Sequence, residues 1–169
     1  MLTRKISLII TPLFFSGILF ASLFTSVSAR ADDAKADDIL GFWLTEEKTG
    51  VIEIKKNTKD EYYGEIVWVK DIHTGKVKDK KDVKNPDEKL RDRSILGMKN
   101  TWGFKFDGDD EWEDGNIYDP KSGKIYSAQM ELEDNGQRLD LRGYVGVPLF
   151  GRTTEWTREK GKVPEYIKK

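Results

Sequence analysis

The chain of 169 residues carries 29 Lys and Arg against 30 Asp and Glu, and it has one histidine and no cysteine. The lack of cysteine excludes a disulfide scaffold, thiolate metal sites and thiol catalysis, so the fold must be stabilised by a hydrophobic core. A net charge of −1 offers no basic surface for a nucleic acid, and we expect none as a partner.

Residues 1–29 have the layout of a secretory signal peptide. Two basic residues precede an almost wholly apolar stretch, residues 6–24, and small residues then lead to Ala29. This order of charged, apolar and small-residue regions is typical of a cleaved export signal. We expect cleavage after Ala29 or Ala31, a periplasmic or secreted bacterial protein, and no stable membrane insertion after cleavage.

After a flexible lead-in over residues 30–38, hydrophobic and polar residues alternate and turn-forming residues recur regularly, which is typical of short antiparallel strands. Residues 39–158 are predicted to form a single β-barrel domain, and residues 159–169 a C-terminal tail. Eight strands are expected, over residues 41–45, 51–56, 61–70, 99–106, 111–118, 124–132, 138–147 and 152–158. Consecutive strands joined by tight turns favour an all-β fold: an eight-stranded antiparallel up-and-down barrel, whose interior is filled by side chains or holds one small ligand.

A charged excursion separates the third and fourth predicted strands. Residues 71–84 are dominated by lysine and aspartate and are predicted to be a solvated loop. Asn85, Pro86 and Glu88 occupy the N-cap, first helical and capping-box positions of a short helix expected over residues 85–93. His73 lies in the loop and is interpreted as a solvated side chain rather than a catalytic base.

The two ends of the predicted barrel carry complementary residues. Gly41 and Trp43 lie on the first strand and Arg158 ends the last, and these strands are neighbours in a closed barrel. A guanidinium group over an indole ring contributes about 0.5–2 kcal/mol. We therefore predict a structural latch formed by Gly41, Trp43 and Arg158. It resembles the Gly-x-Trp signature and closing arginine of the lipocalin-like (calycin) barrels, and this resemblance implies a small hydrophobic ligand.

Longer segments are similar to the bacterial family known as domain of unknown function 2147. The similarity rests on "GFW", "NPDEKLRDRSILG", "WEDGNIYDPKSGKIYSAQMEL" and "LRGYVGVPLFGRTTEWTR", and it extends over roughly residues 39–158. The resemblance implies a small exported bacterial protein with one domain, and it implies no activity.

Arg142 and Tyr144 are candidate ligand contacts. Positions i and i+2 share a strand face, so the pair could hold a carboxylate jointly, and it resembles the Arg-x-Tyr pair of the intracellular fatty-acid carriers. The alternative is that the pair faces outward, opposite a core face formed by Leu139, Leu141, Val145 and Val147. Further candidate ligand contacts are Arg91 and Arg93, beside the predicted helix, and the aromatic residues Trp68, Trp102 and Tyr126.

The content of the barrel depends on which face of each strand points inward. Large aromatic residues could fill the interior, whereas small residues at four positions would leave room: Gly64, Ala128, Gly143 and Gly146. A one-residue change in strand phase exchanges the two faces, so both a packed and a hollow barrel stay open.

The leading hypothesis is an exported binding module that holds a small hydrophobic or amphipathic, lipid-like molecule without a cofactor. The alternative is a packed barrel that serves as an interaction or structural module with a protein partner in the cell envelope. An outer-membrane barrel fits less well, because charged residues recur on both strand faces. No catalytic motif is found, so no enzyme is predicted. The acidic run at residues 107–113 is interpreted as a solvated hairpin turn rather than a calcium site, and no metal ligand is predicted.

Overall fold

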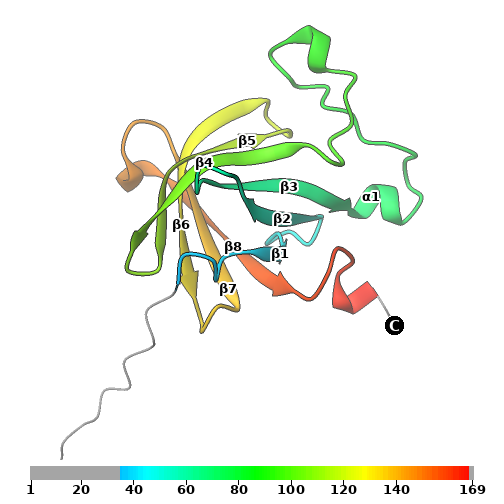
Figure 1. Cartoon of the computed structure of the whole chain (residues 1–169). Helices are drawn as coiled ribbons and strands as arrows, with labels where there is room; N and C mark the ends of the chain where they lie inside the picture. Colours follow the sequence, from blue (N-terminus) through cyan, green and yellow to red (C-terminus); the bar gives the residue numbers. More distant parts are fainter. Residues whose placement is uncertain (1–34, 168–169) are drawn as a thin grey trace, which may run out of the picture.

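The computed structural model describes residues 35–167, and the expected signal peptide and its two cleavage positions lie outside this range. Eight antiparallel strands pair in sequence order and close into a barrel, because β1 pairs with both β2 and β8 (Figure 1). The predicted eight-stranded up-and-down barrel is therefore confirmed. The strands are β1 (Gly41–Leu44), β2 (Gly50–Lys56), β3 (Tyr62–Val69), β4 (Lys99–Gly108), β5 (Glu111–Asp119), β6 (Lys124–Glu133), β7 (Arg138–Tyr144) and β8 (Arg152–Glu159).

The up-and-down topology gives the barrel two different ends. The connections β1–β2, β3–β4, β5–β6 and β7–β8 lie at one end, which we call the open end. The connections β2–β3, β4–β5 and β6–β7 lie at the other, which we call the sealed end. The N-terminal segment, residues 35–40, crosses the sealed end, where the indole nitrogen of Trp43 donates to the Ile39 carbonyl at 2.8 Å and that of Trp112 to the Ala36 carbonyl at 3.2 Å.

Large side chains fill the sealed half of the barrel. Its most deeply buried members come from six strands and the N-terminal segment: Ile39, Trp43, Tyr62, Phe104, Trp112, Met130 and Leu139. The packing leaves no space for a side chain at Gly115, where a Cβ would lie 2.2 Å from the Phe104 ring. This half of the molecule is a close-packed core, as the packed-barrel alternative expects.

A second hydrophobic cluster lies against the outer face of β1, β2 and β3. It consists of Leu44, Val51 and Trp68, with Val163 and Ile167 of the C-terminal segment packed over it. A register shift at Val51/Ile52 places one extra residue, Val67, in β3, so Trp68 lies in the outer cluster although Ile66, two residues earlier, belongs to the main core. The tail up to residue 167 is thereby packed against the barrel rather than free of it.

The excursion between β3 and β4 has less helix than the sequence predicts. The short α-helix of this connection, α1 (Lys70–His73), directly follows β3 (Figure 1). The segment expected to be helical over residues 85–93 contains only one 3₁₀ turn, η1 (Glu88–Leu90). Its N-cap is Asp87 rather than Asn85, because the Asn85 side chain bonds to a buried carboxylate, that of Asp82.

The seventh strand ends earlier than predicted. Its pairing with β6 stops at Tyr144, and Val145 and Val147 are 76% and 51% exposed instead of forming a core face. Gly146 has a φ of +81°, and a 3₁₀ turn, η2 (Pro148–Phe150), follows it. Because the backbone leaves the extended conformation here, the alternation of the sequence no longer assigns faces.

Candidate functional site

A cavity of about 740 Å³ occupies the open half of the barrel. Its wall is mainly aliphatic and aromatic, and it is built by residues of seven strands and by Ile95 of the excursion. The apolar lining includes Ile52, Ile66, Val69, Ile95, Ile117, Tyr126, Leu141 and Trp156. The barrel is therefore packed at one end and hollow at the other.

Small residues account for part of the space. Gly143 lines the cavity opposite Ile117 and Tyr126, each 3.7 Å from the position that a Cβ would take. Two of the four small residues that were expected to leave room do not do so. Gly146 lies in the exposed turn after β7, and Gly64 is packed against Thr101 and Ile52.

One patch of the wall is polar. The side-chain oxygen of Asn100 lines this region, and the hydroxyl of the adjacent Thr101 is fully buried. Neither oxygen has a hydrogen-bond partner among residues 35–167. An unpaired buried polar group costs about 1–3 kcal/mol, so both oxygens lower the stability of the fold. Of the two residues, Asn100 lines the cavity and Thr101 does not.

Both signs of charge line the mouth of the cavity, with five basic residues against three acidic ones: Lys80, Lys81, Lys84, Lys121 and Arg152 against Glu46, Glu47 and Asp119. Lys80 and Lys81 are engaged by Asp71 and Asp79 at 3.0 Å each. Lys84 and Arg152 also line the mouth, and neither forms an ion pair within the described part of the chain. The mouth thus offers two cations to an incoming anionic group.

The two sides of the mouth are in direct contact at Gly123. This glycine closes the β5–β6 turn with a φ of +73°, and a Cβ would lie 2.0 Å from the carbonyl oxygen of Lys84 in the excursion. Only glycine fits this contact, so the turn fixes the distance between the excursion and the strands beneath it.

A buried carboxylate holds the excursion on the barrel. Asp82 is fully buried and accepts from the Tyr118 hydroxyl at 2.6 Å, from Asn85 at 2.7 Å and from two nitrogens of Arg93 at 3.0 and 2.8 Å. Burial, and then the bond to Asp82, raise the pKa of Tyr118 to about 12, so this hydroxyl stays a donor. Asp82 lies within residues 71–84, and the prediction of a wholly solvated loop is wrong at this residue.

The latch lies at the sealed end. The guanidinium carbon of Arg158 is 4.2 Å from the centre of the Trp43 ring, and the two residues are register partners of β8 and β1. The same side chain donates to the carbonyls of Leu40 at 3.0 Å, Asp38 at 2.5 Å and Gly136. Gly41 leaves room for it, since a Cβ there would be 3.5 Å from one of its nitrogens.

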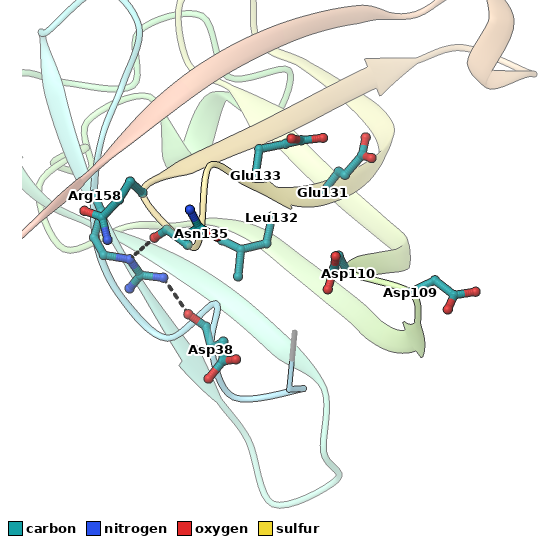
Figure 2. Close-up of a pocket in the computed structure, with 10 residues that line it drawn as sticks. Asp38, Asp109, Asp110, Glu131, Leu132, Glu133, Asn135 and Arg158 are labelled. Carbon is teal, nitrogen blue, oxygen red and sulfur yellow. Dashed lines mark hydrogen bonds between the residues drawn. The ribbon is translucent and has the colours of Figure 1, made fainter. Parts of the chain in front are cut away.

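A second pocket, of about 630 Å³, lies beside the latch. Figure 2 shows Asp38, Asp109, Asp110, Glu131 and Glu133 around it, with Arg158 bonded on one side. Nearby, carboxylate oxygens of Asp107, Glu111 and Glu113 lie within 4.8 Å of one another. These acids sit in and beside the β4–β5 hairpin, as the sequence predicts, and they give the sealed end a negative surface.

The comparisons place this geometry in a family. Residues 41–158 match the family model described as "Uncharacterized protein conserved in bacteria (DUF2147)". The chain belongs to the DUF2147 family. The resemblance noted in the sequence is thereby confirmed.

This DUF2147 protein also resembles a solved structure. Protein HP1028 from the human pathogen Helicobacter pylori, described as belonging to the lipocalin family, shares 26% identity and a TM-score of 0.64, over 72% of this chain and 83% of that one. The expected lipocalin-like architecture agrees with this likeness. No curated protein matches the chain. Between residues 35 and 167, no helix has the length and apolar character needed to cross a membrane.

The structure disperses the residues that the sequence suggested as ligand contacts in this DUF2147 protein. Of the three aromatic candidates, Tyr126 lines the cavity, Trp102 is half-buried against the core, and Trp68 lies in the outer cluster with its ring 5.6 Å from that of His73. Arg93 is bound to Asp82, and Arg91 to Glu88 and the Asn85 carbonyl.

The Arg142 and Tyr144 candidates do not face the cavity. Arg142 donates to the carbonyls of Pro148 and Leu149 and to the Thr153 hydroxyl. Tyr144 is half-buried at the end of β7, opposite Ser127. Residues that the sequence interpretation missed as wall or mouth residues are Asn100, Lys84, Arg152 and Thr154. Arg152 and Thr154 could have been predicted from the sequence, since residues two apart on a strand share a face and Trp156 points inward.

The acidic surface gives a prediction on stability. Glu111 and Glu131 are directly opposite on β5 and β6. Partial burial raises the pKa of Glu131, and the charges of Glu133 and Glu111 add to it. A carboxyl with a raised folded-state pKa binds its proton more tightly in the folded protein, so the protein gains stability as the pH falls through that pKa. The gain is complete below the ordinary value of 4.5.

We therefore expect Glu131→Gln to raise the free energy of unfolding at pH 7 by about 0.2–1 kcal/mol, because like charges directly opposite in a sheet are destabilising. Urea denaturation at pH 7 and pH 4 measures the effect. The difference between variant and wild type should shrink at pH 4. A difference that stays equal at both pH values would contradict electrostatic repulsion as the cause.

Proposed function

We propose that this protein is an exported carrier that binds one lipid-sized molecule in the open half of the barrel. The observation that carries the proposal is the apolar cavity of about 740 Å³ beside a fully packed core. This volume lies in the range of about 300–1,000 Å³ that is typical of small-molecule sites. A chain that only served as a packed structural module would gain stability by filling such a space.

The chemistry of the wall and mouth favours an amphipathic ligand with an acidic polar end. Its apolar part would lie among Ile52, Ile117 and Trp156, and its polar end would meet Lys84 and Arg152, which lack acidic partners. Charge-assisted hydrogen bonds from a lysine and an arginine suit a carboxylate or a phosphate.

Two further observations support the proposal. The Helicobacter protein is described as a member of the lipocalin family, and eight-stranded barrels of that kind are wide enough to hold one small ligand. The signal-like residues 1–29 support a periplasmic or secreted location, where an apolar molecule needs a carrier in water.

We expect Gly143→Leu to weaken ligand binding by about tenfold or more, because the new side chain would project between Ile117 and Tyr126 into the cavity. The probe is parinaric acid, a fluorescent fatty acid, titrated into the protein with the signal segment removed. Gly161→Leu is the matched control, since Gly161 has nothing within 4 Å of its Cβ position.

Native mass spectrometry of protein purified from its own cell envelope complements the titration. A bound species of lipid-like mass in the wild type, and its loss in Gly143→Leu, is the expected result. Absence of probe binding together with repeated recovery of bare protein would contradict the carrier function. That result would favour the alternative of a module that acts through its surface.

A further inference from the structure

Exposed hydrophobic side chains are concentrated at the open end of the barrel. Among the large hydrophobic residues that are exposed in the described chain, all except Tyr166 lie in or beside the open-end connections. The most exposed are Leu149 at 79%, Phe150 at 81% and Val145 at 76%, all in the β7–β8 connection. Val83 in the excursion, 66% exposed, and Ile125 beside the β5–β6 turn, 57% exposed, lie on other parts of the same rim.

The β7–β8 connection, residues 145–151, is held in a defined shape by hydrogen bonds. The Arg142 side chain donates to the Pro148 carbonyl at 2.7 Å and to the Leu149 carbonyl at 3.3 Å. Gly151 donates to the Pro148 carbonyl at 2.8 Å, and a Cβ on Gly151 would lie 2.9 Å from the Gly143 carbonyl oxygen. These bonds present Leu149 and Phe150 to solvent as a fixed apolar tip.

The charge of the molecule is divided along the barrel axis. Residues 70–98 at the open end carry nine lysines and arginines against six aspartates and glutamates. The other open-end positions add Lys48, Lys121, Lys124 and Arg152 against Glu46, Glu47 and Asp119, so the basic excess remains. At the sealed end, residues 107–113 carry five acids and no base. An anionic surface would therefore attract the open end and repel the sealed end.

We propose that the open end docks onto an anionic lipid bilayer, with Leu149 and Phe150 inserted at the level of the headgroups and the cavity mouth turned towards the lipid. An apolar tip flanked by cations is the combination that binds at a membrane surface, where insertion and attraction to anionic lipids add together. This docking goes beyond the carrier function, because it states where the carrier loads or delivers its cargo.

Flotation with lipid vesicles tests the docking. The protein with its signal segment removed is mixed with vesicles of phosphatidylglycerol and phosphatidylcholine, or of phosphatidylcholine alone, in low salt. We expect binding to the anionic vesicles that falls as salt is added, and at least about tenfold weaker binding to the neutral ones.

Two variants assign the contact. Leu149→Ser with Phe150→Ser, and separately Lys84→Glu with Arg152→Glu, should each reduce binding to anionic vesicles by about tenfold or more. Lys59→Ser with Gln137→Ser, two exposed positions in sealed-end turns, is the control and should bind like the wild type. Near-ultraviolet circular dichroism checks that all variants are folded.

Three outcomes would overturn the docking. The first is equal binding to both kinds of vesicle, and the second is unchanged binding of the Leu149 and Phe150 variant. The third is a wild-type protein that binds no vesicles and forms a dimer, which this variant converts to a monomer. The last result would assign the apolar tip to contacts between copies of the chain. Titration of the Leu149 and Phe150 variant with parinaric acid separates the two proposals, since its binding in solution should equal that of the wild type even where docking is lost.

Discussion

Replacing Arg158 with alanine is expected to lower the free energy of unfolding by about 3 kcal/mol. Hydrogen bonds from a charged group contribute about 1.5–3 kcal/mol, and the stacking on Trp43 adds to them. The side chain connects β8 to the N-terminal segment and to the β6–β7 turn, so its loss leaves the carbonyls of Asp38, Leu40 and Gly136 without this donor. Urea or thermal denaturation followed by tryptophan fluorescence measures the change.

Two further substitutions make this result specific. Arg158→Lys keeps a positive charge but cannot donate in three directions from a flat group, so it should recover less than half of the lost stability. Arg152→Ala, on the same face of the same strand, is the control and should change the stability by less than about 0.5 kcal/mol. If Arg152→Ala and Arg158→Ala are equally destabilising, the latch has no special contribution.

The second large effect is expected at Asp82. Removal of one partner from a buried ion pair costs about 3–5 kcal/mol, and the partial exposure of Arg93, at 38%, places the expected loss for Asp82→Ala near the lower limit. Tyr118 and Asn85 also lose their acceptor. Because these bonds anchor the excursion rather than the barrel, the substitution should also release residues 74–98 locally.

Limited proteolysis, combined with urea denaturation, distinguishes local release from global unfolding. We expect trypsin to cut Asp82→Ala within the lysine-rich excursion before the barrel unfolds, while the wild type resists at the same enzyme concentration. Asp92→Ala is the matched control, since its carboxylate is 97% exposed and contacts only Lys81, at 3.7 Å. Similar cleavage of both variants would contradict the anchoring function of Asp82.

The barrel and its closure could be predicted from the sequence because both depend on local patterns. Alternation and turn residues define strands one at a time, and eight strands in sequence order leave few ways to pair. The latch followed in turn, since closure makes the first and last strands neighbours, and Trp43 and Arg158 are suited to each other by chemistry.

The cavity could not be predicted because it depends on small changes in strand phase. Register shifts that insert an extra residue in β3, β4 and β5 exchange the faces within a strand, and the alternation does not reveal them. The outward position of Arg142, in contrast, follows from regular alternation with Leu139 and Leu141, since no register shift interrupts the pairing of β7 with β6 or β8.

The burial of Asp82 was hidden for a different reason. An aspartate among lysines has the composition of a solvated loop, and its partner on the barrel, Tyr118, is 36 residues away in the sequence. Long-range pairing of polar groups has no period, so only the folded chain brings them together.

The alternation of connections between the two ends has a consequence for how such proteins diverge. The sealed end contains the packed aromatic core and the latch, whereas the loops that line the mouth belong to three open-end connections, β1–β2, β3–β4 and β5–β6. Substitutions in those loops can therefore change what enters the barrel while the parts that determine its stability are kept. Under the proposed carrier function, one scaffold can in this way supply relatives with different cargo, provided that Gly123 and Asp82 still fix the excursion above the mouth.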